Sequence, residues 1–191
     1  RRAGLVPRMN HPPPAAAQPA GVTAVHGQAS VVTHGQRTQV TTVNGAGTRH
    51  SVLDWRSFDV PARTSTHFQQ PGRDSTSINR VLGGDPSSIL GRLSSNGHLV
   101  LVNPAGIAVG GTAAVDTAGF TASTLGLSAQ DAVAGRLRFS AGGTPGALRI
   151  DGRVHVDGGD IVLIAPDLQV GEKARLHARD GSILLAAGQK V

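Results

Sequence analysis

"RVHVDGGDIVLIA" at residues 153–165 and "RLHARDGSILLAA" at residues 175–187 are two copies of one pattern. Six of the thirteen positions are identical, and the copies lie 22 residues apart. Repeats of this length indicate stacked structural units. Each unit holds about three short strands, near 153–156, 161–165 and 168–170. This is typical of a coil of a parallel β-helix, in which residue i lies above residue i+22.

The composition favours the same all-β fold. Among 191 residues there are 26 glycines, no tyrosine, four phenylalanines and a single tryptophan, Trp55, so the core has to be built from Val, Ile, Leu and Ala. Runs such as LVLV (99–102) and ILLAA (183–187) match the near-continuous apolar strands of buried parallel sheets. Rungs stack about 4.8 Å apart, so about six rungs would make a rod roughly 30 Å long. The absence of cysteine excludes disulfides and thiolate metal sites.

The net charge of +6 comes from scattered arginines, with Lys173 and Lys190 as the only lysines. No block of like charge and no basic stripe with stacking aromatics is visible, so we expect a solvated basic surface and no nucleic-acid partner. No apolar run approaches the roughly 20 residues of a membrane span, and no signal peptide is visible. We therefore expect no membrane insertion.

The chain divides into a short tail and one domain. Residues 1–20 are rich in Pro and Ala, which predicts disorder, and "GLVPRM" within them resembles a protease site left by recombinant expression. Residues 21–191 form the domain. Its last residues end in the middle of the repeat, so we expect a longer protein whose next rung covers that edge.

Two stretches depart from the regular rungs. Residues 30–45 alternate around a turn and predict paired strands. Trp55 and Phe58 follow closely and predict an apolar plug within an N-terminal cap. Residues 128–137 are the best candidate for a helix, and it is short.

The residues that could act in catalysis or bind a metal do not form a pattern that predicts a catalytic, cofactor or metal site. His155 and His177 fall one rung apart, which indicates a structural stack rather than a metal pair. A carboxylate cluster of the polysaccharide-cleaving kind could include Asp151, Asp157, Asp160 and Asp167 with Arg149 and Arg153. Most of these aspartates stand beside glycine at predicted corners, where Asp is a turn former.

A strong turn interrupts the apolar run "LVLVNPAGIAVGG" at residues 99–111. Asn103, Pro104 and Gly106 occupy positions i, i+1 and i+3 of a type I turn. Pro104 has no N–H, so no central strand passes through it. Taken alone, N-P-x-G is an ordinary tight turn at a rung corner.

Several motifs in one order make the chain recognisable. They are Asn79-Arg80-Val81, the Gly83–Ser87 turn, Gly91, Asn96-Gly97 and Asn103-Pro104-x-Gly106-Ile107. This series resembles the two-partner secretion (TPS) domain at the amino terminus of filamentous-haemagglutinin-like exoproteins. The resemblance covers roughly residues 21–191. The family signature more often reads Asn-Pro-Asn-Gly-Ile, and here the third residue is Ala105. A recognition role for that second Asn side chain therefore does not carry over.

The resemblance implies a right-handed parallel β-helix with an N-terminal cap and extra-helical antiparallel strands. It implies no enzyme, but a secretion signal and folding nucleus of a large exported protein, with an adhesin as passenger. The implied partner is a cognate outer-membrane TpsB-type transporter of the Omp85 superfamily, which binds through its POTRA domains in the periplasm. The implied location is the medium or cell surface of a Gram-negative bacterium, and the domain is expected to be a monomer.

The resemblance also supplies the candidate site. These residues serve transporter recognition, folding nucleation or both: Asn79, Arg80, Asn96, Gly97, Asn103, Pro104, Gly106 and Ile107. Two other functions stay open at this point. One is an adhesive domain that itself binds glycans or haem, and the other is a β-helix enzyme acting on polysaccharide.

Overall fold

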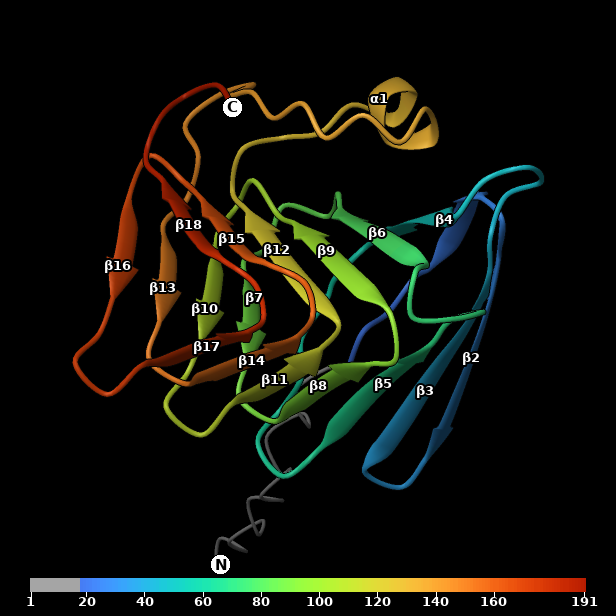
Figure 1. The fold of residues 1–191 in the computed structure, drawn as a ribbon, viewed down its shortest axis with the longest axis horizontal. Coiled ribbons are helices and arrows are strands. Elements are labelled where there is room, and N and C mark those ends of the chain that lie inside the picture. The colour runs from blue at the N-terminus through green and yellow to red at the C-terminus, as the bar shows by residue number, and fades with distance from the viewer. Residues whose placement is uncertain (1–17) are drawn as a thin grey trace, which may run out of the picture.

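The computed structural model describes residues 18–191 as a parallel β-helix with three sheets along its sides (Figure 1). Sheet 1 has the order β1 (Thr23–His26), β4 (His50–Trp55), β6 (Thr76–Val81), β9 (His98–Val102), β12 (Gly119–Ser123), β15 (Ile161–Ile164) and β18 (Ile183–Ala186). Sheet 2 has the order β16 (Leu168–Val170), β13 (Leu148–Ile150), β10 (Ile107–Val109) and β7 (Ser87–Ile89). Sheet 3 has the order β17 (Arg175–Arg179), β14 (Arg153–Asp157), β11 (Ala114–Thr117), β8 (Arg92–Ser95), β5 (Ser65–Gln69), β3 (Arg37–Val43) and β2 (Gln28–His34).

The 22-residue repeat is confirmed as the register of the last rungs. His155 pairs with His177 between β14 and β17, and Leu163 pairs with Leu185 between β15 and β18. All neighbours in these sheets run parallel except at the N-terminal end. One rung therefore passes through sheet 3, sheet 1 and sheet 2 in turn.

Residues 124–147, between β12 and β13, lie outside the regular rungs and cover the outer face of sheet 1 (Figure 1). We call this segment the excursion. The predicted helix is confirmed but shorter than expected: α1 spans Ala129–Val133, and the Ser128 hydroxyl caps it by accepting from the Asp131 N–H. The segment then pairs with the last residues of the chain, since the Ala141 N–H donates to the Gln189 carbonyl. The sequence pattern predicted the helix but not this excursion.

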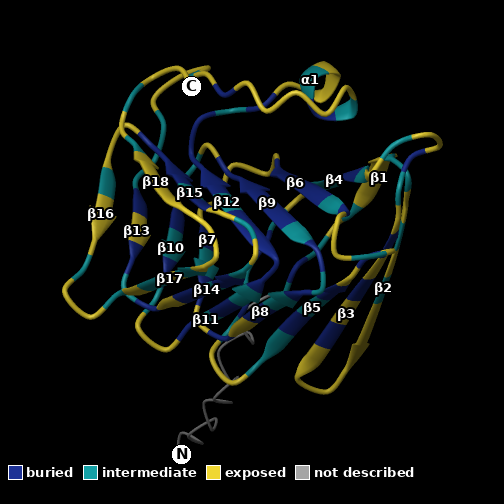
Figure 2. Ribbon diagram, viewed as in Figure 1, coloured by how far each residue is buried: buried dark blue, intermediate teal, exposed yellow. Residues whose placement is uncertain are grey.

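The middle strands of sheet 1 are buried on both faces, which explains their continuous apolar sequence. Inside the rod, Leu101 and Leu163 belong to the main core, whereas on the outer face Val100 packs with Leu125 and Phe139 of the excursion. Figure 2 shows the resulting dark band through β6, β9, β12 and β15. A strand covered on both sides gains from apolar residues at every position.

Antiparallel strands cap one end of the stack, as predicted. β1 pairs antiparallel with β4, and β2 forms a hairpin with β3. The buried rings of Trp55 and Phe58 meet edge to face with centroids 5.4 Å apart, and Phe68 lies 6.0 Å from Phe58. This aromatic cluster closes the core below the cap.

The other end of the stack is more exposed. β18 is the last strand of sheet 1, and Ile183, Leu184 and Leu185 are about half exposed.

At the start of the described chain, Ala20 already bridges Ser57, so order begins before residue 21. The rest of the tail predicted to be disordered, residues 1–17, lies outside the described residues.

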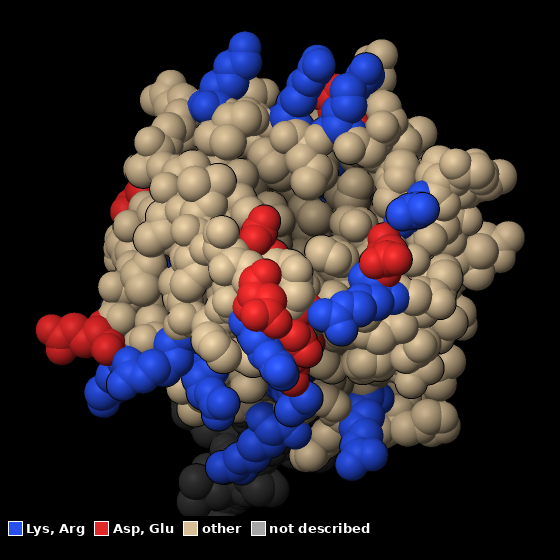
Figure 3. All heavy atoms as spheres, viewed as in Figure 1, with Lys and Arg blue, Asp and Glu red and all other residues tan. Residues whose placement is uncertain are grey.

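Charged side chains concentrate on the outside of the rod. Figure 3 shows lysine and arginine side chains gathered along the lower part of this view, over the strands of sheet 3. Within residues 18–191, no helix has the length and apolar character needed to cross a bilayer.

Candidate recognition and folding motif

The Asn103 turn forms the corner between β9 and β10. The Gly106 N–H donates to the Asn103 carbonyl at 3.1 Å, and the Ala105 N–H donates to Asn103 Oδ1 at 3.0 Å. The predicted tight turn is confirmed. Asn103 Nδ2 donates to the Asp85 carbonyl and to Ser87 Oγ, both at 2.9 Å. The side chain is only 1% exposed, so all of its polar atoms are satisfied within the protein.

The same turn is bonded to the rungs on both sides. Towards the cap, the Gly106 carbonyl accepts from the Ser87 N–H at 3.0 Å. Away from the cap, the Ile107 N–H donates to the Ala147 carbonyl at 3.0 Å, and the Pro104 carbonyl accepts from the Gly146 N–H at 2.8 Å. A Cβ at Gly146 would lie 2.1 Å from the Ala105 carbonyl oxygen, so only glycine fits there. The turn thus links three successive rungs.

Asn79 lies inside the rod on β6. Its Oδ1 accepts from Trp55 Nε1 at 2.8 Å, and its Nδ2 donates to Ser77 Oγ at 3.1 Å and to the Val100 carbonyl at 3.4 Å. Asn79 is 1% exposed. The amide therefore connects the aromatic cluster of the cap to β9.

Arg80 makes the most buried ion pair among the described residues. Its Nε and Nη2 each donate to a different carboxylate oxygen of Asp54 at 2.8 Å. Its Nη1 donates to the Leu127 carbonyl at 2.9 Å. A bidentate pair of this kind fixes orientation as well as adding energy. Arg80 therefore holds the excursion against sheet 1.

Asn96 and Gly97 form the corner between β8 and β9. Asn96 Oδ1 accepts from the Gln70 N–H at 2.7 Å, and Asn96 Nδ2 donates to the Gln70 carbonyl at 2.9 Å. The Asn96 side chain thus forms with the Gln70 backbone the pair of hydrogen bonds that a neighbouring strand would otherwise form. A Cβ at Gly97 would lie 2.7 Å from the Ser75 carbonyl oxygen, which explains the glycine.

The predicted site residues surround β9 but do not form one surface patch. Asn79 and Arg80 pair with Leu101 and Val102, directly before the Asn103 turn. Asn96 and Gly97 lie at the opposite end of β9. Sequence reasoning missed the partners of these residues, among them Asp54, Gln70 and Gly146. The signal for Asp54 was a lone acid inside the apolar stretch "SVLDW".

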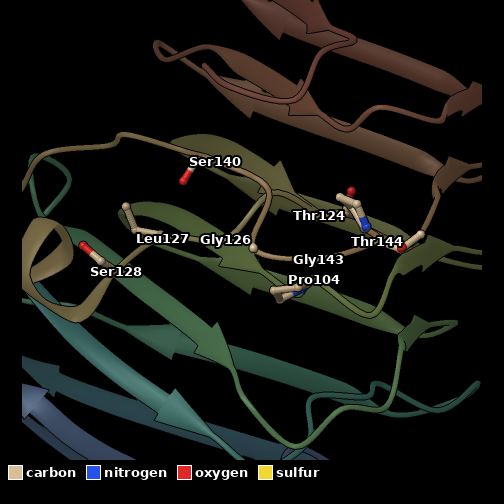
Figure 4. Close-up of a pocket in the computed structure, with 10 residues that line it drawn as sticks. Pro104, Thr124, Gly126, Leu127, Ser128, Ser140, Gly143 and Thr144 are labelled. Carbon is tan, nitrogen blue, oxygen red and sulfur yellow. The ribbon is translucent and has the colours of Figure 1, made fainter.

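Pro104 is the exposed member of the motif and borders a pocket of about 410 Å³ (Figure 4). The opposite wall is the end of the excursion, including Ser140 and Gly143. Thr124 Oγ1 is buried at this pocket and has no hydrogen-bond partner among the described residues. Within the Asn103 turn, a partner of the folded domain would meet Pro104, which is exposed, and Ala105, which is partly exposed.

Comparison with known protein families assigns the chain to one of them. The model of the TPS secretion domain matches residues 15–191, which include every residue of the motif. The chain belongs to the TPS secretion-domain family. Domains of this family act as secretion signals of exoproteins that leave Gram-negative cells through outer-membrane transporters.

Solved and curated relatives agree with this identification. The HMW1 secretion domain from Haemophilus influenzae has a crystal structure that is similar with a TM-score of 0.79 and 28% identity, over 90% of this chain and 45% of that one. Two heme/hemopexin-binding proteins of Haemophilus influenzae are 29% identical over 89% of this chain and 37% identical over 41% of it. The chain spans 19% and 8% of their lengths, respectively.

The other chemical candidates of this TPS domain have structural partners. The Nδ1 atoms of His155 and His177 lie 3.0 Å apart, which confirms the predicted stack. Asp151 forms an ion pair with Arg149, and Asp160 Oδ1 accepts from the Ser182 N–H. Asp167 accepts from the Gln169 side chain. These carboxylates lie on different corners of the rod.

One carboxyl near the motif has a shifted pKa. Burial raises the pKa of Asp59, and the charge of Asp85 adds to this, whereas the hydrogen bond from the Ser88 N–H opposes it. Ser88 N donates to Asp59 Oδ1 at 2.8 Å. Asp59 therefore anchors the turn whose Asp85 carbonyl accepts from Asn103.

Proposed function

We propose that this TPS domain is recognised unfolded by the POTRA domains of its cognate TpsB-type transporter, and that its motif residues act in folding. The observation that carries the proposal is the Asn103 amide, which is buried and fully bonded between rungs. A partner of the folded domain has no access to that side chain. A partner that recognises the Asn103 side chain has to bind it before the rungs have folded.

The unfolded chain suits such recognition. Its segments are β-prone, and an extended segment can add as a strand to the edge of a partner's sheet. After passage through the transporter, Asn79, Arg80 and Asn103 would join the cap, the excursion and the first rungs through the bonds described above. A formed rung then offers a strand edge to the next one.

The test compares two buried isoleucines on neighbouring strands, only one of which belongs to the motif. Ile107 and Ile150 lie on neighbouring strands of sheet 2, are at most 2% exposed, and replacement of either by alanine costs about 2–5 kcal/mol. The exported chain is co-expressed with its genomically paired transporter, and the culture medium is assayed. We expect Ile107→Ala and Ile150→Ala to reduce secretion equally when their unfolding free energies fall equally.

Two other results contradict the proposal. If Ile107→Ala abolishes secretion while Ile150→Ala is secreted normally at the same stability, the transporter recognises the motif directly. If the wild-type domain stays in the periplasm with the transporter present, it is not the export signal. A transporter lacking its POTRA domains serves as the negative control, and we expect no secretion from it.

We further propose that the domain is a monomer without catalytic activity and that its passenger is an adhesin. Support for the absence of catalysis comes from the carboxylates, which are engaged as turn formers and ion-pair partners on separate corners. The two relatives are named for binding heme and hemopexin, and they are far longer than this chain. Any comparable activity here would belong to the passenger.

A further inference from the structure

Four arginines that are distant in the sequence stand in one column on the outer face of sheet 3. The register pairs Arg37 with Ser65, Ser65 with Arg92, Arg92 with Ala114, Ala114 with Arg153, and Arg153 with Arg175. All four arginines are exposed, and Thr38, Leu93 and Val154, the residues after the first three, are buried. We call Arg37, Arg92, Arg153 and Arg175 the basic ladder. The expectation that no basic stripe exists is therefore wrong.

The spacing of the basic ladder follows the rungs of the rod. Neighbouring strands lie about 4.8 Å apart, so the column extends about 24 Å along the rod. Arg153 and Arg175 are adjacent, whereas the small residues Ser65 and Ala114 separate the other arginines by about twice that distance. The result is a row of arginine positions along sheet 3, with one small residue between some of them.

The surroundings of the ladder keep it positive. The seven strands of sheet 3 contain five arginines and two aspartates. Asp116 lies 3.3 Å from Arg92, and Asp157 lies 3.7 Å from Arg73 outside the ladder. Within residues 18–191, Arg37 and Arg153 form no ion pair. The lower part of Figure 3 shows many basic side chains, with fewer acidic ones among them.

We propose that the basic ladder binds a linear sulfated polysaccharide along the rod axis. A guanidinium group donates two parallel hydrogen bonds to an anion such as sulfate or carboxylate, and a linear polyanion can lie along a row of such groups. Single-stranded nucleic acid is disfavoured because it needs aromatic platforms for its bases. Trp55 and all four phenylalanines are buried, so none of these rings is available for stacking on this face.

The experiment titrates the purified chain with a heparin oligosaccharide at physiological ionic strength and follows the heat of binding. The double variant Arg153→Gln/Arg175→Gln should weaken binding about tenfold, since two charge-assisted contacts are lost. By analogy with polyanionic nucleic acid, the slope of log K against log salt should fall by about two. The conservative pair Arg153→Lys/Arg175→Lys keeps the charge but loses the bidentate geometry, and should bind with intermediate affinity.

The matched control removes two arginines from the opposite side of the rod. Arg136 and Arg138 follow α1 on the excursion and are exposed, so Arg136→Gln/Arg138→Gln changes the net charge equally. We expect at most about a twofold loss from it, with unchanged unfolding midpoints for all three variants. Equal weakening by the control pair would overturn the proposal, as would the absence of saturable binding.

A third arm separates the polysaccharide from nucleic acid. An oligothymidylate of matched charge should bind more weakly than the heparin oligosaccharide, because the ladder supplies no stacking surface. Equal or tighter binding of the oligothymidylate would overturn the choice of partner. No transporter is present in these titrations, so their outcome is independent of the proposed secretion function.

Discussion

Asn103 shows how a single side chain can determine a rung corner. Its Oδ1 orders the turn itself, while its Nδ2 reaches back to Asp85 and Ser87 on the preceding rung. A hydroxyl or a shorter side chain could satisfy the turn but not the bonds between rungs. The requirement for asparagine therefore comes from the stacking of rungs and not from the turn alone.

Asn103→Asp tests that distinction. The carboxylate keeps the acceptor for the Ala105 N–H but directs negative charge at the Asp85 carbonyl, in a site that is 1% exposed. We expect a loss of about 2–4 kcal/mol in unfolding free energy, measured by urea denaturation. Pro104→Ala, on the exposed ring of the same turn, should cost under about 1 kcal/mol. Similar losses from both changes would show that only the turn matters.

At the scale of elements, two histidines join the cap to the excursion. The rings of His26 on β1 and His50 on β4 lie 4.6 Å apart. His50 Nε2 donates to the Val133 carbonyl at the end of α1 at 2.9 Å, and His26 Nε2 lies 2.9 Å from Thr48 Oγ1. Burial lowers the pKa of His26, and the neighbouring His50 lowers it further.

This lowered pKa predicts that stability falls on acidification. The unfolded chain binds a proton at His26 more readily than the folded domain does, so the stabilisation is fully present above about pH 6.5 and is lost as the pH falls from there towards the folded pKa. We expect the urea midpoint to drop between about pH 7.5 and pH 5.5, a window above the ordinary carboxyl range. His26→Gln should flatten this dependence. A variant as pH-sensitive as wild type would refute the assignment to His26.

The predictability of each element from the sequence depended on its regularity. The two rungs at 153–165 and 175–187 are uninterrupted, so identical residues fall at one spacing and reveal the fold. The excursion breaks that spacing, because Phe120 pairs with Ile161 across the whole of residues 124–147. Only the capped helix within it carried a local signal.

The sequence indicated candidate site residues but could not predict their contacts. Family motifs indicated Asn79, Arg80 and Asn103, yet their partners lie a rung away and follow no local rule. The basic ladder was invisible for the same reason. Its arginines are separated by unequal lengths of chain, and only the register of sheet 3 aligns them.

At the scale of the whole molecule, the rod is a nearly one-dimensional stack. Each rung bonds mainly to its two neighbours, as in other repeat proteins, so stability is expected to vary along the axis. The cap end has aromatic packing, the middle strands of sheet 1 are covered by the core on one face and by the excursion on the other, and the last strands pack on one side only. A signal domain that folds rung by rung would have its strongest contacts where folding begins.

Amide hydrogen exchange measures this gradient directly. Val100 and Leu101 on β9 are at most 2% exposed and have a strand on each side, whereas Leu184 on β18 is 53% exposed and pairs only with β15. We expect amides of β18 to exchange at least about a hundredfold faster than those of β9, because local opening of an end strand costs far less than global unfolding. β15, one rung further in, should be intermediate. Equal protection of β9 and β18 would instead mean that the stack opens only as a single cooperative unit, in which case folding could not proceed by adding one stable rung at a time.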